Sequence, residues 1–375
     1  MTDPAFRQFT RRQLTLAMAC AAVAPGLALG AAGKPVPSLG QALGPRLPFG
    51  MAVTPAQMAS SDAALVQHHA SIIVAENAMK PSELSPRAEG QYSFEVADAM
   101  VNKALELGLK VRGHTLIWHQ QTPPWMFLEN GQTVSRATLI ERMRRYITDV
   151  VTHFKGRVYA WDVVNEAFCF GEANVKTDAE GMRMSPWREI IGPEFIDIAF
   201  EAASAADPNA LLFYNDYETQ NADKVKAVSR MVRQLKGRGI KIDGIGHQSH
   251  MTVTHPRLSE VEASLIAYAE LGVTQQITEL DIALNADLTK NQVPRATPRL
   301  LALQAQRYAD MFRLFLKHRD KLSAVVVWGV DDRQSWLNYW PMRRFEAPLL
   351  LDRQQQPKPA FWAVLEVAKA AKTAP

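Results

Sequence analysis

Two glutamates that end apolar runs are the first candidates for chemistry. Glu166 closes the run Trp-Asp-Val-Val-Asn-Glu at 161–166, and Glu279 lies in Gln-Ile-Thr-Glu-Leu-Asp at 276–281. A carboxyl group behind an apolar strand is partly withdrawn from water, which suits a general acid, although either glutamate alone could equally be an exposed loop residue. Two such groups on one scaffold are the equipment for glycosidic bond cleavage, in which one protonates the leaving oxygen and the other attacks the anomeric carbon.

A second acidic residue close to Glu279 suggests a supporting histidine. Glu279 and Asp281 alternate with Leu280, so both point to the same side of a strand. Two ionised carboxylates so close repel each other, and His250, on the preceding strand, is the candidate to lie between them. We expect Asp281 to orient the imidazole and His250 to keep Glu279 ionised and aimed. A lone histidine is more often a core residue, but the carboxylate pair favours a site here.

Flat aromatic side chains, on which sugar rings pack, are the next requirement of such a site. Five tryptophans fall after candidate strands: Trp118, Trp125, Trp328, Trp336 and Trp340. Trp161 and Trp187 are expected to pack in the core instead.

The scaffold that positions these residues alternates short apolar runs with longer helical patterns from residue 48 onward, which is typical of βα units. The candidate strands are 49–53, 71–75, 110–115, 158–165, 211–215, 244–248, 276–280 and 324–328. The candidate helices are 139–154, 194–206, 224–235, 258–271, 300–318 and 359–370. Polar residues follow nearly every strand, whereas an open, doubly wound sheet collects its ligand chemistry at one switch point. We therefore predict an α/β fold, a single (β/α)₈ TIM barrel over residues 48–375.

The N-terminus predicts an export signal. Arg11-Arg12 precedes an alanine-rich apolar stretch and then small residues, which together indicate a cleavable signal of the twin-arginine type over residues 1–32. Residues 33–47 are interpreted as a linker or N-terminal extension. A proline-glycine pair interrupts the apolar stretch, which is shorter than the ~20 residues of a membrane span. The expected location is periplasmic or extracellular.

Cysteines and charge restrict the partners. Cys20 would leave with the signal, with a lipid anchor there as a minor alternative, so Cys169 has no partner for an internal disulfide. The net charge of +4 comes from scattered basic residues, which predicts no nucleic-acid partner. The sequence has no compact cluster with zinc-ligand spacing, so we expect no catalytic metal and no cofactor, while a structural calcium ion stays open. We expect no membrane association of the mature form, and a monomer.

Six short motifs follow one another along the chain. They are Ala-Glu-Asn-Ala-Met-Lys (75–80), Val-Arg-Gly-His-Thr-Leu-Ile-Trp-His (111–119), Trp-Asp-Val-Val-Asn-Glu (161–166), Gly-His-Gln-Ser-His (246–250), Ile-Thr-Glu-Leu-Asp (277–281), and Trp-Gly-Val (328–330) with Ser-Trp (335–336). In sequence and order they resemble the motifs of glycoside hydrolase family 10 xylanases, and the resemblance runs from about residue 49 to residue 368. The resemblance implies a retaining endo-1,4-β-xylanase that acts through a covalent glycosyl-enzyme, with Glu166 as acid/base and Glu279 as nucleophile. Xylan and xylo-oligosaccharides are the implied substrates.

The resemblance also implies binding residues. Glu76, Asn77 and Lys80 would hold the distal glycone sugar. The sugar at the cleavage point would be surrounded by His114, Trp118, Asn165, Gln248, Trp328 and Trp336. Tyr217 is assigned to the aglycone side. His247 and Pro81 depart from the family pattern, and we expect them to alter packing or subsite detail but not the chemistry.

Two alternatives stay open. A related barrel glycosidase could act on glucan or mannan, or release sugars from chain ends. A carbohydrate-binding protein could have kept the barrel and lost turnover, although such a protein would tolerate loss of a carboxylate and both glutamates are present.

Overall fold

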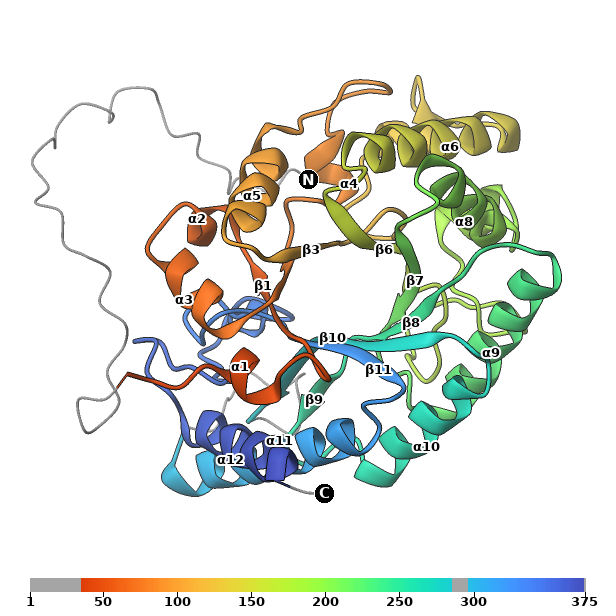
Figure 1. Ribbon diagram of the computed structural model, residues 1–375. Helices are drawn as coiled ribbons and strands as arrows, with labels where there is room; N and C mark the ends of the chain where they lie inside the picture. Colours follow the sequence, from red (N-terminus) through yellow and green to blue (C-terminus); the bar gives the residue numbers. More distant parts are fainter. Residues whose placement is uncertain (1–34, 285–295, 374–375) are drawn as a thin grey trace, which may run out of the picture.

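The computed structural model describes residues 35–284 and 296–373, and within them eight parallel strands close into a barrel with helices outside it (Figure 1). The strands are β1 (Phe49–Val53), β2 (Ile72–Ala75), β3 (Lys110–Gly113), β6 (Val158–Asn165), β7 (Leu211–Asp216), β8 (Gly244–His247), β10 (Thr274–Ala283) and β11 (Leu322–Val327). They pair in this order, and β11 pairs with both β10 and β1, which closes the ring. The predicted (β/α)₈ barrel is confirmed.

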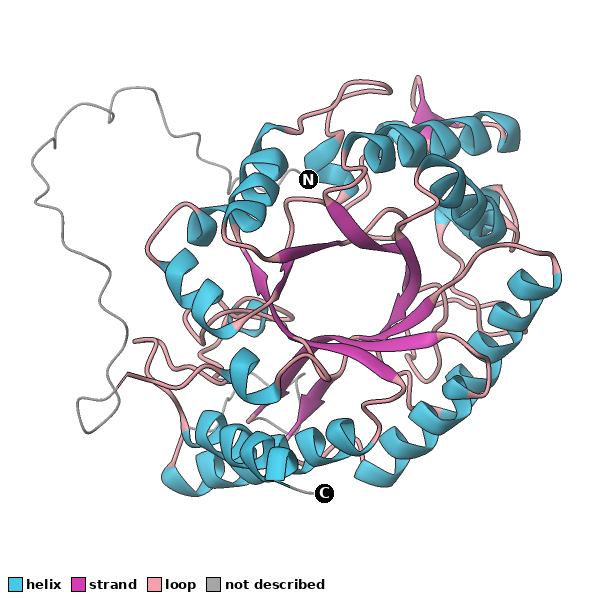
Figure 2. Ribbon diagram, viewed as in Figure 1, coloured by secondary structure: helices cyan, strands magenta, loops and turns pink. Residues whose placement is uncertain are grey.

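The helices form the outer layer (Figure 2). The longer ones are α3 (Asp62–His69), α5 (Glu95–Glu106), α6 (Arg136–His153), α8 (Phe195–Ala206), α9 (Ala222–Gly237), α10 (Leu258–Ala269), α11 (Pro298–Lys317) and α12 (Pro359–Thr373). Shorter pieces are α2 (Pro55–Met58), α4 (Pro81–Leu84), α7 (Pro186–Ile190) and the 3₁₀ turns η1 (Pro124–Met126) and η2 (Trp336–Asn338). Side-chain caps explain several helix starts, since Ser135, Asn221 and Thr297 accept backbone N–H bonds at the first turns of α6, α9 and α11.

Three small elements lie outside this alternation. The strands β4 (Leu128–Glu129) and β5 (Gln132–Thr133) form a hairpin after η1. Strand β9 (His250–Thr252) follows β8 after a two-residue break and pairs in parallel with the end of β10. His250 therefore does not lie on the same strand as residues 244–247, as the sequence suggested, but on this separate short strand.

The N-terminal helix α1 (Leu39–Leu43) packs on the barrel. Leu39 is fully buried, α1 contacts α12, and Lys372 Nζ donates to Gln41 O at 2.7 Å. A Cβ atom on Gly40 would lie 2.6 Å from the carbonyl oxygen of His69, so the close approach of α1 to α3 requires glycine. Part of the segment predicted as an N-terminal extension is thus integrated with the last helix of the barrel.

The predicted export signal over 1–32 and Cys20 lie outside the described residues. None of the helices within 35–284 and 296–373 has the length and apolar character needed to cross a membrane.

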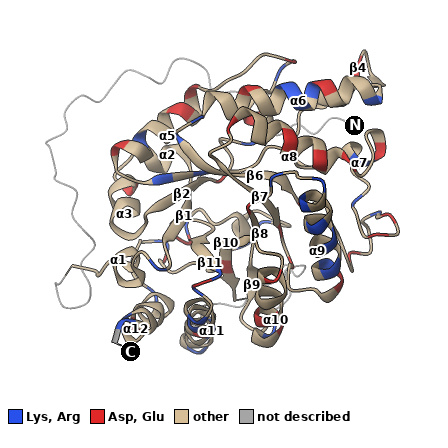
Figure 3. Cartoon of the chain, turned by 45° about the vertical axis from the view of Figure 1, so that its right-hand side comes forward, with Lys and Arg blue, Asp and Glu red and all other residues tan. Residues whose placement is uncertain are grey.

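The charged residues of the described chain lie mainly on the outer helices, and Lys and Arg predominate on α9 (Figure 3). Acidic neighbours offset this basic surface: Arg230 pairs with Glu180 and Arg238 with Asp197.

A buried ion pair lies inside the barrel. The guanidinium of Arg112, on β3, bonds both carboxylate oxygens of Asp162 on β6, and its Nε donates to Gln276 Oε1 on β10 at 2.9 Å. Strands β3 and β10 are not neighbours, so this contact crosses the barrel interior. All three side chains are buried, and their mutual bonds satisfy the charges.

Candidate active site

Glu279, on β10, lies in the histidine–carboxylate chain that the sequence suggested. His250 Nδ1 lies 3.0 Å from Asp281 Oδ2, and its Nε2 lies 3.1 Å from Glu279 Oε2. Burial alone would lower the pKa of His250, but the charge and hydrogen bond of Asp281 and the bond to Glu279 outweigh it and raise the pKa to about 10. His250 is therefore a cation at neutral pH, and both of its ring nitrogens donate.

The same contacts keep Glu279 ionised although its side chain is only 4% exposed. Burial raises its pKa, but the hydrogen bond from His250, the charges of His114 and His250, and a 2.7 Å bond from Asn215 Nδ2 outweigh burial and lower the pKa to about 2. Glu279 is thus a carboxylate at all but strongly acidic pH, which is the state that a nucleophile needs.

Glu166 follows the last residue of β6 and has a different environment. Its Oε2 accepts from Trp118 Nε1 at 2.8 Å, and its Oε1 accepts from Gln248 Nε2 at 2.9 Å and from Asn165 Nδ2 at 3.2 Å. These three donors are neutral, and the side chain is partly exposed. A carboxyl group held this way can exchange a proton with a ligand in the opening.

Two asparagines connect the carboxylates. Asn215 Nδ2, on β7, donates to Glu279 Oε1 and, at 2.9 Å, to Asn165 Oδ1, while Asn165 in turn donates to Glu166. Glu166 and Glu279 therefore share one opening at the carboxyl ends of the strands. Asn215 has little freedom, because a Cβ atom on the neighbouring Gly246 would lie 2.3 Å from its Oδ1.

Lys80 is only 6% exposed, so it is not a solvated surface charge. Its Nζ donates to Asn77 Oδ1 and to Gln121 Oε1, both at 2.9 Å, and lies 4.9 Å from the ring centre of Trp118. Burial lowers the pKa of Lys80, and the carboxylates of the site oppose that shift. Burial also raises the pKa of Glu76, against the charge of Lys80. The predicted glycone residues are thus one polar cluster.

The tryptophans divide into two groups. Trp336 Nε1 donates to Asp281 Oδ2 at 2.7 Å, and Trp340, 55% exposed, stacks on Trp336 with ring centres 5.1 Å apart. Trp125 packs against the core instead and donates to Ser85 O at 2.7 Å, so it adds no platform next to the carboxylates. Trp161 and Trp187 are buried, as expected.

His114 follows β3 and joins the site to the buried ion pair. Its Nδ1 lies 2.9 Å from Asp162 Oδ2, and its ring lies edge-on to Trp328 with centres 5.4 Å apart. The charge pair inside the barrel thus orients a residue next to Glu279.

Tyr217, in the turn after β7, accepts from Arg183 Nη2 at 2.7 Å and donates to Glu172 Oε1. The Lys224 ammonium lies 3.8 Å from its ring centre. These contacts fix the phenol ring, and its assignment to the aglycone side stays a prediction.

The sequence analysis did not assign several residues that the structure brings to the site. Asn215 and Gln121 contact assigned residues directly, and Asn215 was visible as a polar residue at a strand end.

His247, where the chain departs from the family pattern, bonds Thr219 Oγ1 at 2.7 Å and Gln275 Oε1 at 2.9 Å; burial lowers its pKa to about 4. It touches neither glutamate, in agreement with the expected change in packing.

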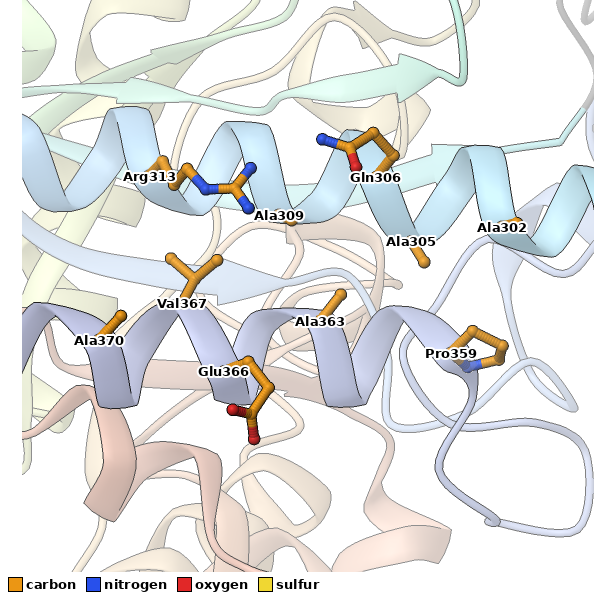
Figure 4. A pocket seen from close by; sticks show the side chains of 10 residues that line it. All are labelled: Ala302, Ala305, Gln306, Ala309, Arg313, Pro359, Ala363, Glu366, Val367 and Ala370. Atoms are coloured by element: carbon orange, nitrogen blue, oxygen red, sulfur yellow. The ribbon is translucent and has the colours of Figure 1, made fainter.

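A hollow between α11 and α12 lies in the outer helix layer (Figure 4). Alanines make up half of its lining, and its charged residues Arg313 and Glu366 pair with neighbours on their own helices. It contains none of the catalytic candidates. Over the described ranges, no group of three or more His, Cys, Asp or Glu side chains could hold a metal ion.

Comparisons with known proteins find a matching family, similar sequences and similar structures. The sequence model of glycosyl hydrolase family 10 matches residues 38–367. An endo-1,4-beta-xylanase of Geobacillus stearothermophilus is 40% identical over 335 residues, which cover 88% of this chain and 99% of that protein. A thermostable celloxylanase of Thermoclostridium stercorarium is 38% identical over 348 residues, which cover 89% and 88%. A solved structure of a mutant in complex with xylotriose has a TM-score of 0.82 at 34% identity and covers 88% of this chain and 100% of that one.

Proposed function

This chain belongs to glycosyl hydrolase family 10, and from that premise we propose that it is a retaining endo-1,4-β-xylanase, with Glu279 as nucleophile and Glu166 as acid/base. The observation that carries the assignment of roles is the contrast between the two carboxyl groups. Glu279 is buried and held ionised by a cationic His250. The carboxyl group of Glu166 is partly exposed, and the side-chain donors that orient it are neutral, which suits the group that exchanges a proton with the substrate.

In the first step, Glu279 attacks the anomeric carbon from one face while Glu166 protonates the glycosidic oxygen. The bond from C1 to the leaving oxygen breaks, its electron pair goes to that oxygen, and the shortened aglycone chain departs. The products of this step are a glycosyl ester on Glu279 and an ionised Glu166.

In the second step, Glu166 takes a proton from a water molecule, which attacks C1. The ester bond breaks, Glu279 regains its carboxylate, and Glu166 is protonated again. Two inversions at C1 restore the β configuration. His250 and Asn215 stabilise the Glu279 carboxylate as it forms, because both donate to its oxygens.

The xylan assignment is supported by the name of the Geobacillus relative and by the xylotriose complex. Because another relative is named a celloxylanase, glucan remains the competing candidate substrate. Hydrolysis rates on xylo- and cello-oligosaccharides of equal length separate these alternatives, and a clear preference for the cello series would overturn the xylan assignment.

Two measurements test the mechanism. In proton NMR of xylo-oligosaccharide hydrolysis, we expect the β anomer to appear first, and initial α product would contradict retention. Glu279→Gln is expected to abolish hydrolysis while xylan binding persists, whereas Glu189→Gln, at an exposed position on α7, is the matched control that keeps full activity. Normal turnover by Glu279→Gln would refute Glu279 as the nucleophile, whereas a wild-type protein that binds xylan without hydrolysing it would favour the carbohydrate-binding alternative.

We further propose export by the twin-arginine route and a monomeric mature protein. The first rests on Arg11-Arg12 ahead of the apolar stretch. The double substitution Arg11→Lys and Arg12→Lys should retain the protein in the cytoplasm. The monomer is tested separately, because sedimentation of the mature form should then give a single species near the monomer mass.

A further inference from the structure

The backbone of Glu166 has an unusual conformation, which hydrogen bonds from neighbouring residues stabilise. Glu166 has φ of 57°, in the left-handed region that residues other than glycine seldom adopt. Such a conformation costs on the order of 1–3 kcal/mol and persists only where the surroundings enforce it. The N–H of Glu166 donates to Asn215 O at 2.9 Å, and its carbonyl accepts from Arg183 Nε at 3.2 Å.

The two peptide N–H groups that follow Glu166 bind one side chain. Tyr214, on β7, accepts from Ala167 N at 3.1 Å and from Phe168 N at 3.3 Å through its hydroxyl oxygen. The same hydroxyl donates to Asp216 Oδ2. A hydroxyl has one proton and two lone pairs, so these three bonds use all of its capacity.

Asp216 determines the orientation of this hydroxyl. Because its carboxylate accepts the hydrogen bond that the Tyr214 hydroxyl donates, both lone pairs of the phenol oxygen are left for the two amides. Asp216 Oδ1 is itself held by Lys224 Nζ at 2.8 Å and by Tyr217 N at 2.9 Å. Tyr214, Asp216 and Lys224 are all buried, so they support the turn from behind and are not exposed to solvent.

We infer that Tyr214 and Asp216 are positioning residues for the acid/base: they fix the turn that follows Glu166 and so aim its carboxyl group at the leaving oxygen. This inference rests on the proposed function of Glu166. The neighbouring Glu279 is held by different side chains, His250 and Asn215. Loss of the Tyr214 hydroxyl should therefore impair proton transfer and spare nucleophilic attack.

Leaving-group dependence separates these two effects. An aryl β-xylobioside that releases 2,4-dinitrophenol needs no protonation of its leaving oxygen, whereas one that releases a phenol of high pKa does. General acid catalysis contributes typically 10²–10⁴-fold, and a misaimed acid loses part of that factor. For Tyr214→Phe we expect kcat/KM to fall about 10- to 100-fold on poor leaving groups and less than about 3-fold on 2,4-dinitrophenol.

Tyr268→Phe is the matched control. Tyr268, on α10, is also buried, and its hydroxyl donates to Thr219 O at 3.1 Å, a carbonyl outside the turn that follows Glu166. This variant loses a buried hydroxyl and stability, but we expect its plot of log kcat/KM against leaving-group pKa to keep the wild-type slope. Only Tyr214→Phe should give a steeper plot.

A Tyr214→Phe plot parallel to that of the wild type, with or without a uniform loss of rate, would overturn the inference. Should Tyr214→Phe not fold, Asp216→Asn removes the charge with little change in volume, and the same steepening or parallel plot decides. A wild-type protein that hydrolyses none of the aryl xylobiosides would instead refute the proposed function.

Discussion

His250→Gln is the substitution that tests most directly how Glu279 is kept ionised. The glutamine side chain is neutral and can still donate one hydrogen bond, so the variant removes the positive charge between Glu279 and Asp281 while it keeps a polar group there. Burial, the largest single influence on the pKa of Glu279, then acts with less opposition and raises that pKa.

The size of the effect follows from the pKa of Glu279. A full return from about 2 to its ordinary 4.5 would correspond to roughly 3 kcal/mol, at about 1.4 kcal/mol per unit, and this is an upper bound because the charge of His114 and the bond from Asn215 remain. At pH 4 such a full return would lower the ionised fraction of Glu279 from about 99% to about 24%. Since the nucleophile must be ionised, activity is lost on the acidic side, and the acid limb of the pH profile moves upward by up to about two units.

The assay is the pH dependence of kcat/KM on an aryl xylobioside between pH 2.5 and 8, because this constant reports the pKa values of the free enzyme. Tryptophan fluorescence at each pH excludes unfolding as the cause of a loss. His247→Gln is the control, since His247 is a buried histidine nearby that touches neither carboxylate. An unmoved acid limb in His250→Gln would refute the view that His250 keeps Glu279 ionised.

Three further substitutions probe the support of the site. Gly246→Ala places a Cβ 2.3 Å from Asn215 Oδ1, so we expect kcat to fall at least about 10-fold with a smaller change in KM; wild-type kinetics would show that Asn215 can move freely. Arg112→Met removes the guanidinium partner of the buried Asp162, and calorimetry should show a loss of about 3–5 kcal/mol; an unchanged melting temperature would mean that the pair adds nothing to stability. Leu39→Ala opens a cavity beside α12, and denaturant unfolding should show a loss of about 2–5 kcal/mol; an unchanged midpoint would mean that α1 contributes nothing to the barrel.

The sequence predicted the fold well because its signals are local. Strands such as Phe49–Val53 and Val158–Asn165 agree with the predicted ranges at both ends, since short apolar runs bounded by polar residues read directly as buried strands. The predicted helices differ from the observed ones by a few residues at their ends. Caps explain part of this: with Ser135 as its cap, α6 begins at Arg136, three residues before the predicted start at Leu139.

Site residues at the ends of strands could be predicted from the sequence. Contacts between side chains on different parts of the barrel could not. His250 between Asp281 and Glu279 followed from charge repulsion within one motif. The bond of Asn215 to Glu279 joins strands that are not neighbours, and no periodicity in the sequence reports such a contact. The hydroxyl of Tyr214 was equally hidden, because an apolar run containing a tyrosine looks like ordinary core.

The two carboxyl groups can take different roles because different kinds of donor surround them. Around Glu279 the neighbouring strand supplies a cation, and the energy of an ion pair in a buried place stabilises the carboxylate against its own desolvation. Around Glu166 the side-chain donors are an indole and two amides, which carry no net charge. In the proposed mechanism, the arrangement of donors on neighbouring strands therefore distinguishes the carboxylate that attacks from the carboxyl group that transfers the proton.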